Sequence, residues 1–394
     1  MKICLINNLY KPYNRGGAER IVELTAEGLL KSGYEILLIT TKPLTHNKTN
    51  PDFKYPVYQI RSLNFVSYYH LPRIPKPFRL IWHLFDMFDL GAYFKIKKII
   101  EMENPQVVVT HNLKGMSYLT PLILRKKRIK HVHVLHDIQL IHPSGLLICG
   151  QENCLNNILS KIYIKINKIL FKSPALIISP SKWLLDLHAS KGFFKQSCKK
   201  VLPNPIFLPT KINRSLKPGG FVFLYVGQLE THKGIFFLIE AFSRLVVEPE
   251  NKISLVICGN GSQEKKAKKA ARYQKNITFK KWESRERAFR EMALADCLVV
   301  PSLCYENSPT VIYEAASLEL PVIAPRLGGT IELVHHIGGL LYNPKNECDL
   351  MYQMKWAINN LAALQKMGVQ SRKKISKFDQ VAYIKKISEF ILKK

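Results

Sequence analysis

Short β-like runs alternate with helix-like stretches along this chain of 394 residues, and the alternation occurs twice. In the first half, apolar runs such as Lys2–Asn7 and Val107–Thr110 flank stretches with helix-spaced apolar residues, the clearest being Ala18–Lys31. After residue 220 the pattern begins again with Phe221–Val226. Strands that alternate with helices need crossover connections, which give a parallel sheet covered by helices on both faces. We therefore predict an α/β fold with two doubly wound domains. The other predicted strands are Ile36–Thr40, His131–Leu135, Leu176–Ile178, Ser254–Cys258, Cys297–Pro301 and Val322–Ala324, and a second helix is predicted over about 234–246.

The break between the two halves is predicted near residue 203. A chain of this length exceeds what one hydrophobic core usually serves. Pro203-Asn204-Pro205 and the loop Lys211–Gly220 have the composition of a connection. We predict domains at 1–203 and 204–375, followed by an amphipathic, basic helix at 376–394. Ligands of open parallel sheets bind beyond the carboxyl ends of the strands, which predicts a site in the cleft between the domains.

The charge is strongly positive, with 59 basic and 29 acidic residues giving +30. Such a field attracts polyanions. The surplus is dispersed and no helix-turn-helix, zinc-finger or RNP-type signature is present, so a nucleic-acid partner is not expected. No apolar run reaches the roughly 18 residues that span a bilayer. The first residues are typical of a strand rather than of a secretory signal, which predicts a cytoplasmic protein.

One basic segment has a composition suited to a membrane surface. Pro72–Lys98 mixes Lys and Arg with Phe, Ile, Leu and Trp, and Arg125-Lys126-Lys127-Arg128 adds a second basic cluster. Basic, aromatic-rich segments without a spanning run are typical of interfacial contact with anionic lipid. We predict a peripheral contact with an anionic membrane surface. The alternative is a general lysine enrichment that reflects base composition.

The most informative stretch is Pro301–Ala316, in which Glu306 and Glu314 lie eight residues apart. Between them, Ser308 is predicted as the N-cap of a helix and Pro309 as its first residue. The start of a helix presents unpaired N–H groups and suits an anion such as a diphosphate. Taken alone, both glutamates could equally be ordinary surface residues.

At this point the sequence resembles a known family. Glu306 through Glu314, with the apolar continuation Ala315–Ala324, is similar to the paired-glutamate motif of family 4 retaining glycosyltransferases of the GT-B fold. The landmarks follow in order over nearly the whole chain. The resemblance implies transfer of a hexose-type sugar, with retention, from a nucleotide diphosphate sugar to a glycan or lipid-linked acceptor in cell-surface polysaccharide or glycolipid biosynthesis. It implies neither a cofactor nor a metal, and no Asp-x-Asp occurs.

The resemblance also assigns donor-binding roles. Gly227–Gly234 is similar to the family's G-R-L…K-G loop, with Lys233 matching the lysine and Gln228 replacing the arginine. It implies that Lys233 stabilises the leaving diphosphate, that Glu306 lies near the donor sugar and that Glu314 binds the ribose. The implied donor-binding residues are Gly227, Gln228, Lys233, Gly259, Asn260, Gly261, Asn307, Ser308, Pro309, Thr310 and Glu314.

In the first domain, two segments match the family. His136-Asp137 is similar to its HD segment, and Gly16-Gly17 to the glycine loop that sugar and acceptor approach. With Glu306 and Lys233, His136 is implied as catalytic. Gly16, Gly17, His111 and Asp137 are implied in an acceptor and phosphate loop. The resemblance further implies that the C-terminal helix packs back on the first domain.

Three other interpretations stay open from the sequence. Gln228, which carries no charge, leaves room for a non-catalytic member that binds nucleotide sugars. A sugar-nucleotide epimerase could use the same architecture. Cys149 and Cys154, with His142 upstream, could hold zinc, but the spacing is loose and no second cysteine pair follows.

Overall fold

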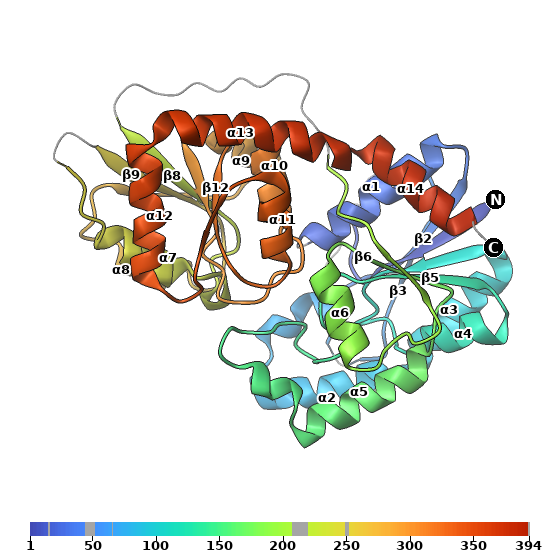
Figure 1. The fold of residues 1–394 in the computed structure, drawn as a ribbon. Coiled ribbons are helices and arrows are strands. Elements are labelled where there is room, and N and C mark those ends of the chain that lie inside the picture. Colours follow the sequence, from blue (N-terminus) through green and yellow to red (C-terminus); the bar gives the residue numbers. More distant parts are fainter. Residues whose placement is uncertain (15, 44–51, 65, 207–219, 249–251, 393–394) are drawn as a thin grey trace. The chain divides into compact units, whose positions relative to one another are not determined.

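The computed structural model describes the chain except residues 15, 44–51, 65, 207–219, 249–251 and 393–394 (Figure 1). The chain forms two compact units. Unit 1 contains residues 1–146, 153–205 and 380–394, and unit 2 contains residues 147–152 and 206–379. The predicted loop Lys211–Gly220 falls almost entirely outside the described residues.

Unit 1 is built on a seven-stranded parallel sheet of order β3-β2-β1-β4-β5-β6-β7. Its strands are β1 (Lys2–Ile6), β2 (Glu35–Thr41), β3 (Val57–Ile60), β4 (Val107–Thr110), β5 (Lys130–Val134), β6 (Leu176–Ser179) and β7 (Cys198–Val201). Its helices are α1 (Gly17–Lys31), α2 (Lys76–Met87), α3 (Leu90–Glu103), α4 (Thr120–Lys126), α5 (Ile158–Phe171), α6 (Lys182–Ser190) and α14 (Gln380–Leu392). The central strands are buried on both faces, as expected for a parallel sheet covered by helices.

The C-terminal helix α14 belongs to unit 1, where it packs on α1. Gly28 permits this contact, because a Cβ there would lie 2.3 Å from Cγ1 of Ile384. Gln380 Nε2 donates a hydrogen bond of 2.7 Å to the carbonyl of Leu24. The apolar face of α14, which includes Tyr383 and Ile387, thereby joins the sheet core.

Unit 2 is built on a six-stranded parallel sheet of order β10-β9-β8-β11-β12-β13. Its strands are β8 (Phe221–Val226), β9 (Ile253–Cys258), β10 (Ile277–Lys280), β11 (Cys297–Val299), β12 (Val322–Pro325) and β13 (Leu340–Tyr342). Its helices are α7 (Ile235–Ser243), α8 (Glu264–Ala270), α9 (Arg285–Ala293), α10 (Thr310–Ser317), α11 (Gly329–Ile337), α12 (Glu347–Asn359) and α13 (Leu361–Ile375).

Each face of the unit 2 sheet has its own core. Along β8, Leu224 and Val226 pack on one side with α9, α10 and α11, while Phe223 and Tyr225 pack on the other with α7 and α12. This division follows from the two-residue period of a strand. The prediction of two doubly wound α/β domains is confirmed.

Some details differ from the sequence predictions. The helix expected over 234–246 ends at Ser243, and the strand expected to reach Pro301 ends at Val299. Strands β3, β7, β10 and β13 were not predicted, because they are short edge or near-edge strands with few apolar residues or interrupted runs. Within the described residues, no helix combines the length and the apolar character needed to cross a bilayer.

Candidate active site

The predicted donor-binding residues gather at one edge of the unit 2 sheet. Gly227 follows β8, Gly259 follows β9, and the loop with Glu306 follows β11. Gly328 follows β12. These strands are parallel neighbours, so their carboxyl ends share an edge, which is where doubly wound sheets bind ligands.

An ion pair between Lys233 and Glu306 lies at the centre of this edge. Lys233 Nζ is 2.5 Å from Oε1 of Glu306. The Ser302 hydroxyl donates to the same oxygen at 3.0 Å. Both charged side chains are largely withdrawn from solvent, with 26% and 18% of their surface exposed. A short turn, η3 (Thr231–Lys233), carries the lysine, and the β11 loop carries the glutamate.

The two charges stabilise each other. Burial opposes the ionisation of Glu306, but the Lys233 ammonium outweighs it and holds the pKa of that carboxyl below its usual range. Burial also opposes the charge of Lys233, yet the Glu306 carboxylate raises the pKa of the lysine. Both groups are therefore ionised at neutral pH. A positive and a negative group are thus held together at the strand edge.

Two glycines fix the backbone around this pair. Gly328 has φ of +60°, and a Cβ there would lie 2.7 Å from the carbonyl oxygen of Glu306. The next residue, Gly329, donates its N–H to that oxygen at 2.9 Å. Gly234 has φ of +76°, and a Cβ there would lie 1.8 Å from the carbonyl oxygen of Pro301. Only glycine tolerates both the conformation and the close approach.

The helix after Glu306 begins differently from the prediction. Ser308 is not the N-cap and Pro309 is not the first helical residue; α10 begins at Thr310, with Pro309 as the N-cap residue. The Ser308 hydroxyl instead shares a hydrogen bond of 2.6 Å with the Tyr313 hydroxyl, which draws it away from the helix start. Pro309, the N-cap residue, has no side chain that can accept a hydrogen bond from the α10 N–H groups. Of these groups, the Ile312 N–H donates to the Pro309 carbonyl at 3.1 Å. The helix start carries the positive end of the α10 dipole, which suits an anion.

Glu314 has a partner that sequence reasoning missed. Its Oε1 lies 2.9 Å from Nη2 of Arg285, the first residue of α9. The carboxylate is 13% exposed and the guanidinium 29%. Arg285 follows β10, one of the strands that the sequence did not reveal, and lies in a charged stretch without a motif. Arg285 thus holds in place the carboxylate to which the family resemblance assigns the ribose.

Replacing Arg285 tests this positioning. In Arg285→Ala, we expect the KM for the donor to rise about tenfold with little change in kcat, because a mobile Glu314 weakens ground-state and transition-state binding alike. Steady-state kinetics with the donor varied would measure it. Arg244→Ala removes another arginine of unit 2 that pairs with Glu347 at 2.8 Å, and it should change neither constant. A fall in kcat at constant KM would contradict the assignment.

The other donor-loop residues pack on one another. The Gln228 carbonyl accepts the Tyr225 hydroxyl at 2.6 Å, and the Gln228 side chain is exposed. Asn260 binds the backbone of Trp282 through both amide atoms, at 2.8 and 3.2 Å. A Cβ at Gly259 would lie 2.0 Å from the Gly227 carbonyl oxygen, and one at Gly261 would lie 2.3 Å from that of Leu229. The close contact between neighbouring loops is therefore enough to require glycine at both positions, whether or not a ligand binds there.

A second support for the Glu306 loop also escaped the sequence. The segment 147–152, far away in the chain, pairs with residues 303–305. Cys149 donates its N–H to the Leu303 carbonyl at 2.9 Å, and the Tyr305 hydroxyl donates to Glu152 at 2.9 Å. Cys149, considered above for zinc, thus takes part in this pairing through its backbone. Among the described residues, no three His, Cys, Asp or Glu side chains form a group that could hold a metal ion.

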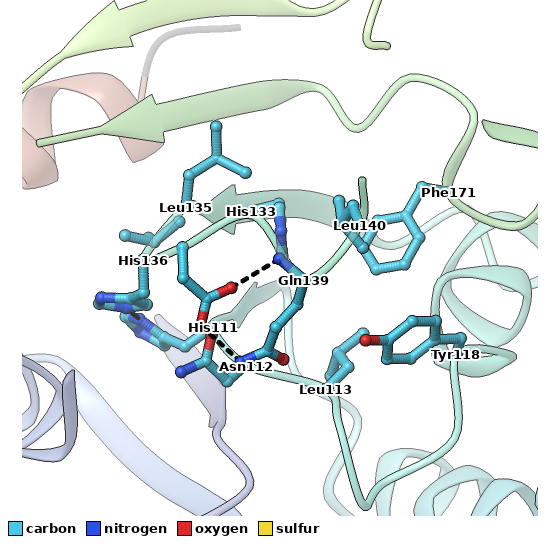
Figure 2. A pocket seen from close by; sticks show the side chains of 12 residues that line it. His111, Asn112, Leu113, Tyr118, His133, Leu135, His136, Gln139, Leu140 and Phe171 are labelled. Atoms are coloured by element: carbon cyan, nitrogen blue, oxygen red, sulfur yellow. Dashed lines mark hydrogen bonds between the residues drawn. The ribbon is translucent and has the colours of Figure 1, made fainter. Parts of the chain in front are cut away.

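In unit 1, the predicted residues line a pocket at the carboxyl ends of β4 and β5 (Figure 2). His111 Nδ1 and His136 Nε2 share a hydrogen bond of 2.9 Å, and their rings stack. Asp137 accepts the backbone N–H of Gln139 at 2.7 Å and its side-chain amide at 2.5 Å. Burial lowers the pKa of His136 to about 4 and raises that of Asp137 to about 6. His136 is therefore a neutral hydrogen-bonding group at pH 7.

The Gly16-Gly17 loop lies at the start of α1, also in unit 1. Gly16 is the N-cap residue and Gly17 the first helical residue. The Glu19 carboxylate accepts the Gly16 N–H at 2.9 Å. A Cβ at Gly16 would meet only that carboxylate, at 3.6 Å, and its φ of −154° is ordinary. The local fold therefore does not require glycine at position 16.

Comparison with known families now decides the class. The family described as "Glycosyl transferases group 1" matches residues 209–374, and the one described as "Glycosyltransferase Family 4" matches residues 15–208. The chain belongs to the family 4, group 1 glycosyltransferases. The expected family and the GT-B fold are thereby confirmed.

Individual relatives agree with this. A capsule-region protein of Klebsiella pneumoniae, described as an uncharacterized 42.6 kDa protein, is 25% identical over 84% of this chain and 87% of its own. The lipopolysaccharide 1,2-N-acetylglucosaminetransferase of Salmonella typhimurium is 32% identical over 41% of this chain and 46% of its own. The structure of Anabaena HepE in complex with UDP matches with a TM-score of 0.72 and 18% identity, covering 99% of both chains.

Proposed function

We propose that this glycosyltransferase transfers a hexose-type sugar from a nucleotide diphosphate sugar to a glycan or lipid-linked acceptor, with retention of the anomeric configuration. The observation that carries the proposal is the ionised Lys233–Glu306 pair, whose glutamate lies in the loop that leads into the start of α10. Such an edge offers positive groups for a diphosphate and a carboxylate for a cationic sugar. HepE was solved with UDP, which supports a nucleotide-linked donor here.

The proposed chemistry separates charge. The bond between the sugar C1 and the diphosphate oxygen breaks, while the acceptor oxygen bonds C1 on the same face and gives its proton to the departing diphosphate. Lys233 and the α10 N–H groups stabilise the negative charge that grows on the diphosphate. Glu306, near the donor sugar, stabilises the oxocarbenium-like centre. Since lysine and backbone N–H groups supply the positive charge, we propose that no metal and no cofactor take part.

The remaining residues are proposed to position the substrates. Glu314, held by Arg285, binds the ribose. His136 donates or accepts a hydrogen bond at a sugar hydroxyl, while His111 and Asp137 hold the surrounding loop. Gly16 and Gly17 leave room for acceptor and phosphate. Positioning the two substrates and stabilising the developing charges supply most of the rate acceleration that such a site can provide.

We propose that the biological setting is the synthesis of cell-surface polysaccharide or glycolipid, in the cytoplasm at the inner face of the membrane. The name of the Klebsiella relative places it in a capsule region, and the Salmonella relative is named for lipopolysaccharide. The charge of +30 favours an anionic membrane surface as a partner, and no nucleic acid is proposed.

A panel of nucleotide sugars tests the donor. We expect one donor to raise the melting temperature, since a ligand at 100 times its Kd stabilises the fold by about 2.7 kcal/mol. Glu314→Ala should abolish this shift in melting temperature. The product, examined by NMR, should have the same anomeric configuration as the donor. EDTA should leave the rate unchanged. Inversion, or a panel without a hit in the presence of acceptor, would contradict the proposal.

A second candidate rests on Gln228, which replaces a charged residue at the diphosphate loop and is exposed. A non-catalytic member would bind a nucleotide sugar but transfer nothing. An epimerase on the same fold would convert the donor without acceptor. Product analysis in the same assay separates all three outcomes.

A further inference from the structure

The exposed side chains that the structure describes on helix α2 are all apolar. Phe78, Ile81, Leu84 and Phe85 are between 47% and 63% exposed, and Phe88, just after the helix, is 47% exposed. The opposite face carries Trp82 and Asp86, which are buried. Large apolar side chains in such a group are uncommon on a soluble surface and mark a site of interaction.

Helix α5 exposes a second apolar stripe. Ile158, Leu159, Ile162 and Ile169 are between 51% and 76% exposed. Beside them, Lys161 and Lys165 are exposed one helical turn apart, and the exposed Lys172 directly follows the last residue of the helix. The helix contains no acidic residue. The sequence predicted membrane contact for Pro72–Lys98 and for the basic cluster Arg125-Lys126-Lys127-Arg128, but not for this helix, whose lysines interrupt its apolar pattern.

Both helices contact one loop at the carboxyl edge of the unit 1 sheet. The loop that follows β4 contacts both: Gly115 donates its N–H to Asp86 of α2 at 2.7 Å, and Tyr118 packs on Phe171 of α5. Tyr163 of α5 is within electrostatic reach of Asp86. Figure 1 draws both helices along the same border of unit 1. The pocket lined by His111 and His136 lies at this same end.

The charges beside the apolar residues are positive. The two acidic residues of the α2 region, Asp86 and Asp89, are buried. Two basic residues that the sequence predicted at a membrane instead have partners within the protein. Arg125 binds carbonyls at the end of α5, and Lys127 pairs with Glu101. No ion pair involves Lys161, Lys165 or Lys172 within the described part of the chain. Lysines of α5 therefore supply the free positive charge.

We infer that these residues form one docking surface for an anionic lipid bilayer and that the acceptor sugar is carried on a lipid. The α2–α5 surface comprises Phe78, Ile81, Leu84, Phe85, Phe88, Ile158, Leu159, Ile162, Ile169, Lys161, Lys165 and Lys172. Apolar side chains enter the headgroup boundary while lysines bind anionic headgroups. A second copy is disfavoured as the occupant, because two such basic surfaces repel each other. The lipid-linked acceptor rests on the proposed function.

Sedimentation with vesicles tests the surface. We expect the full chain to bind vesicles of phosphatidylglycerol and phosphatidylcholine, and to bind phosphatidylcholine alone at least tenfold more weakly. Phe85→Ser/Ile162→Ser and Lys161→Gln/Lys165→Gln should each reduce binding to the anionic vesicles at least tenfold. Val381→Ser, at an apolar residue 77% exposed on α14, and Lys265→Gln/Lys266→Gln, on α8, are matched controls and should bind normally.

Other outcomes overturn the inference. Equal binding to both vesicle types, or normal binding by both surface variants, would refute a lipid surface. Loss of a dimer in Phe85→Ser/Ile162→Ser by light scattering, with unchanged vesicle binding, would assign the surface to a second copy. The nucleotide-sugar thermal shift of the same variants should stay normal, so failure of docking is distinguishable from failure of the proposed function.

Transfer assays test the lipid-linked acceptor. The same acceptor saccharide is presented either free in solution or on a lipid in the anionic vesicles. We expect kcat/KM at least tenfold higher for the lipid-linked form, and Phe85→Ser/Ile162→Ser should remove that gain while leaving transfer to the free saccharide unchanged. Equal rates on the two forms would overturn the lipid-linked acceptor, even if the vesicles bind.

Discussion

Glu306→Ala should lower kcat by roughly 10³-fold or more while the protein stays folded. The carboxylate is held by Lys233 and Ser302 where a cationic sugar centre is proposed to form, and a preorganised charge at such a centre commonly contributes this much. Lys233→Ala should lose a comparable factor, because it removes the positive charge beside the leaving diphosphate. The double variant should be little worse than either single one, since the two side chains act as a unit.

The chain contains a matched control for this experiment. Lys280 and Glu291, also in unit 2, form an ion pair of 2.7 Å whose side chains are 32% and 10% exposed, close to the values for Lys233 and Glu306. Breaking a partly buried pair destabilises a fold. Glu291→Ala should therefore lower the melting temperature about as much as Glu306→Ala but retain near-normal turnover. Similar losses of activity in both variants would show that Glu306 acts only on stability.

Unit 1 should lose stability steeply below pH 6.5. Four of its histidines, namely His111, His131, His133 and His188, are at least 95% buried, and burial holds their pKa values far below the usual value, to about 3 for His131 and about 4 for His188. The unfolded chain binds protons on these rings below about pH 6.5 and the folded chain does not. Stability is therefore present above pH 6.5 and is lost as the pH falls toward the folded pKa values.

Burial keeps these rings neutral, because none of the groups that the structure describes around them would fully compensate a buried positive charge. The Thr110 hydroxyl lies 2.7 Å from His131 Nε2 and 2.8 Å from His133 Nδ1, and it can donate to only one of them. His188 donates Nδ1–H to the Leu184 carbonyl at 2.8 Å, and its Nε2 has no partner among the described residues. A proton added to these rings would bury an uncompensated charge.

Two buried carboxyl groups partly offset this loss of stability at low pH. Burial raises the pKa of Asp86 to about 7 and that of Asp137 to about 6, so both bind protons in the folded state before they do in the unfolded chain. Between pH 7.5 and 5.5 the four histidines lower the free energy of unfolding by about 5 kcal/mol, at about 1.4 kcal/mol per group and pH unit. Over the same range the two carboxyls raise it by about 3 kcal/mol. The net loss in the free energy of unfolding is about 2 kcal/mol, and His136, whose pKa burial also lowers to about 4, adds to this loss.

Hydrogen exchange at pH 7.5, 6.5 and 5.5, corrected for intrinsic rates, measures this loss by unit. Protection should fall for peptides of β4 and β5 in unit 1 and change less for β8 and β9 in unit 2. His188→Phe should flatten the pH dependence, whereas His335→Gln, at an exposed histidine of unit 2, should not. Equal protection of unit 1 at all three pH values would contradict the prediction.

Much of this architecture was predictable because the chain repeats a simple pattern. Central strands such as β4 and β8 are continuous apolar runs with sharp ends, and both were predicted to the residue. Glu306, Lys233 and the glycine loops could be predicted because each follows such a strand and matches a family motif. Short edge strands lack that signal, since β3 and β7 are partly exposed and carry polar side chains.

What the sequence could not predict were contacts between distant segments. Arg285 meets Glu314, and residues 147–152 pair with residues 303–305, through no local pattern. The expected Ser308 cap failed for a local reason, because Tyr313, five residues further on, binds its hydroxyl. On α5, lysines placed between isoleucines concealed the exposed apolar stripe until the three-dimensional structure separated the two.

The placement of α14 in unit 1 has a consequence for how the protein is made. The groove on α1 around Gly28 is filled by Ile384, which lies near the end of the chain. A ribosome therefore completes all of unit 2 before it releases the residues that finish unit 1. During synthesis Leu29 and its neighbours on α1 stay uncovered until then, so unit 1 becomes fully native only after unit 2 has been translated.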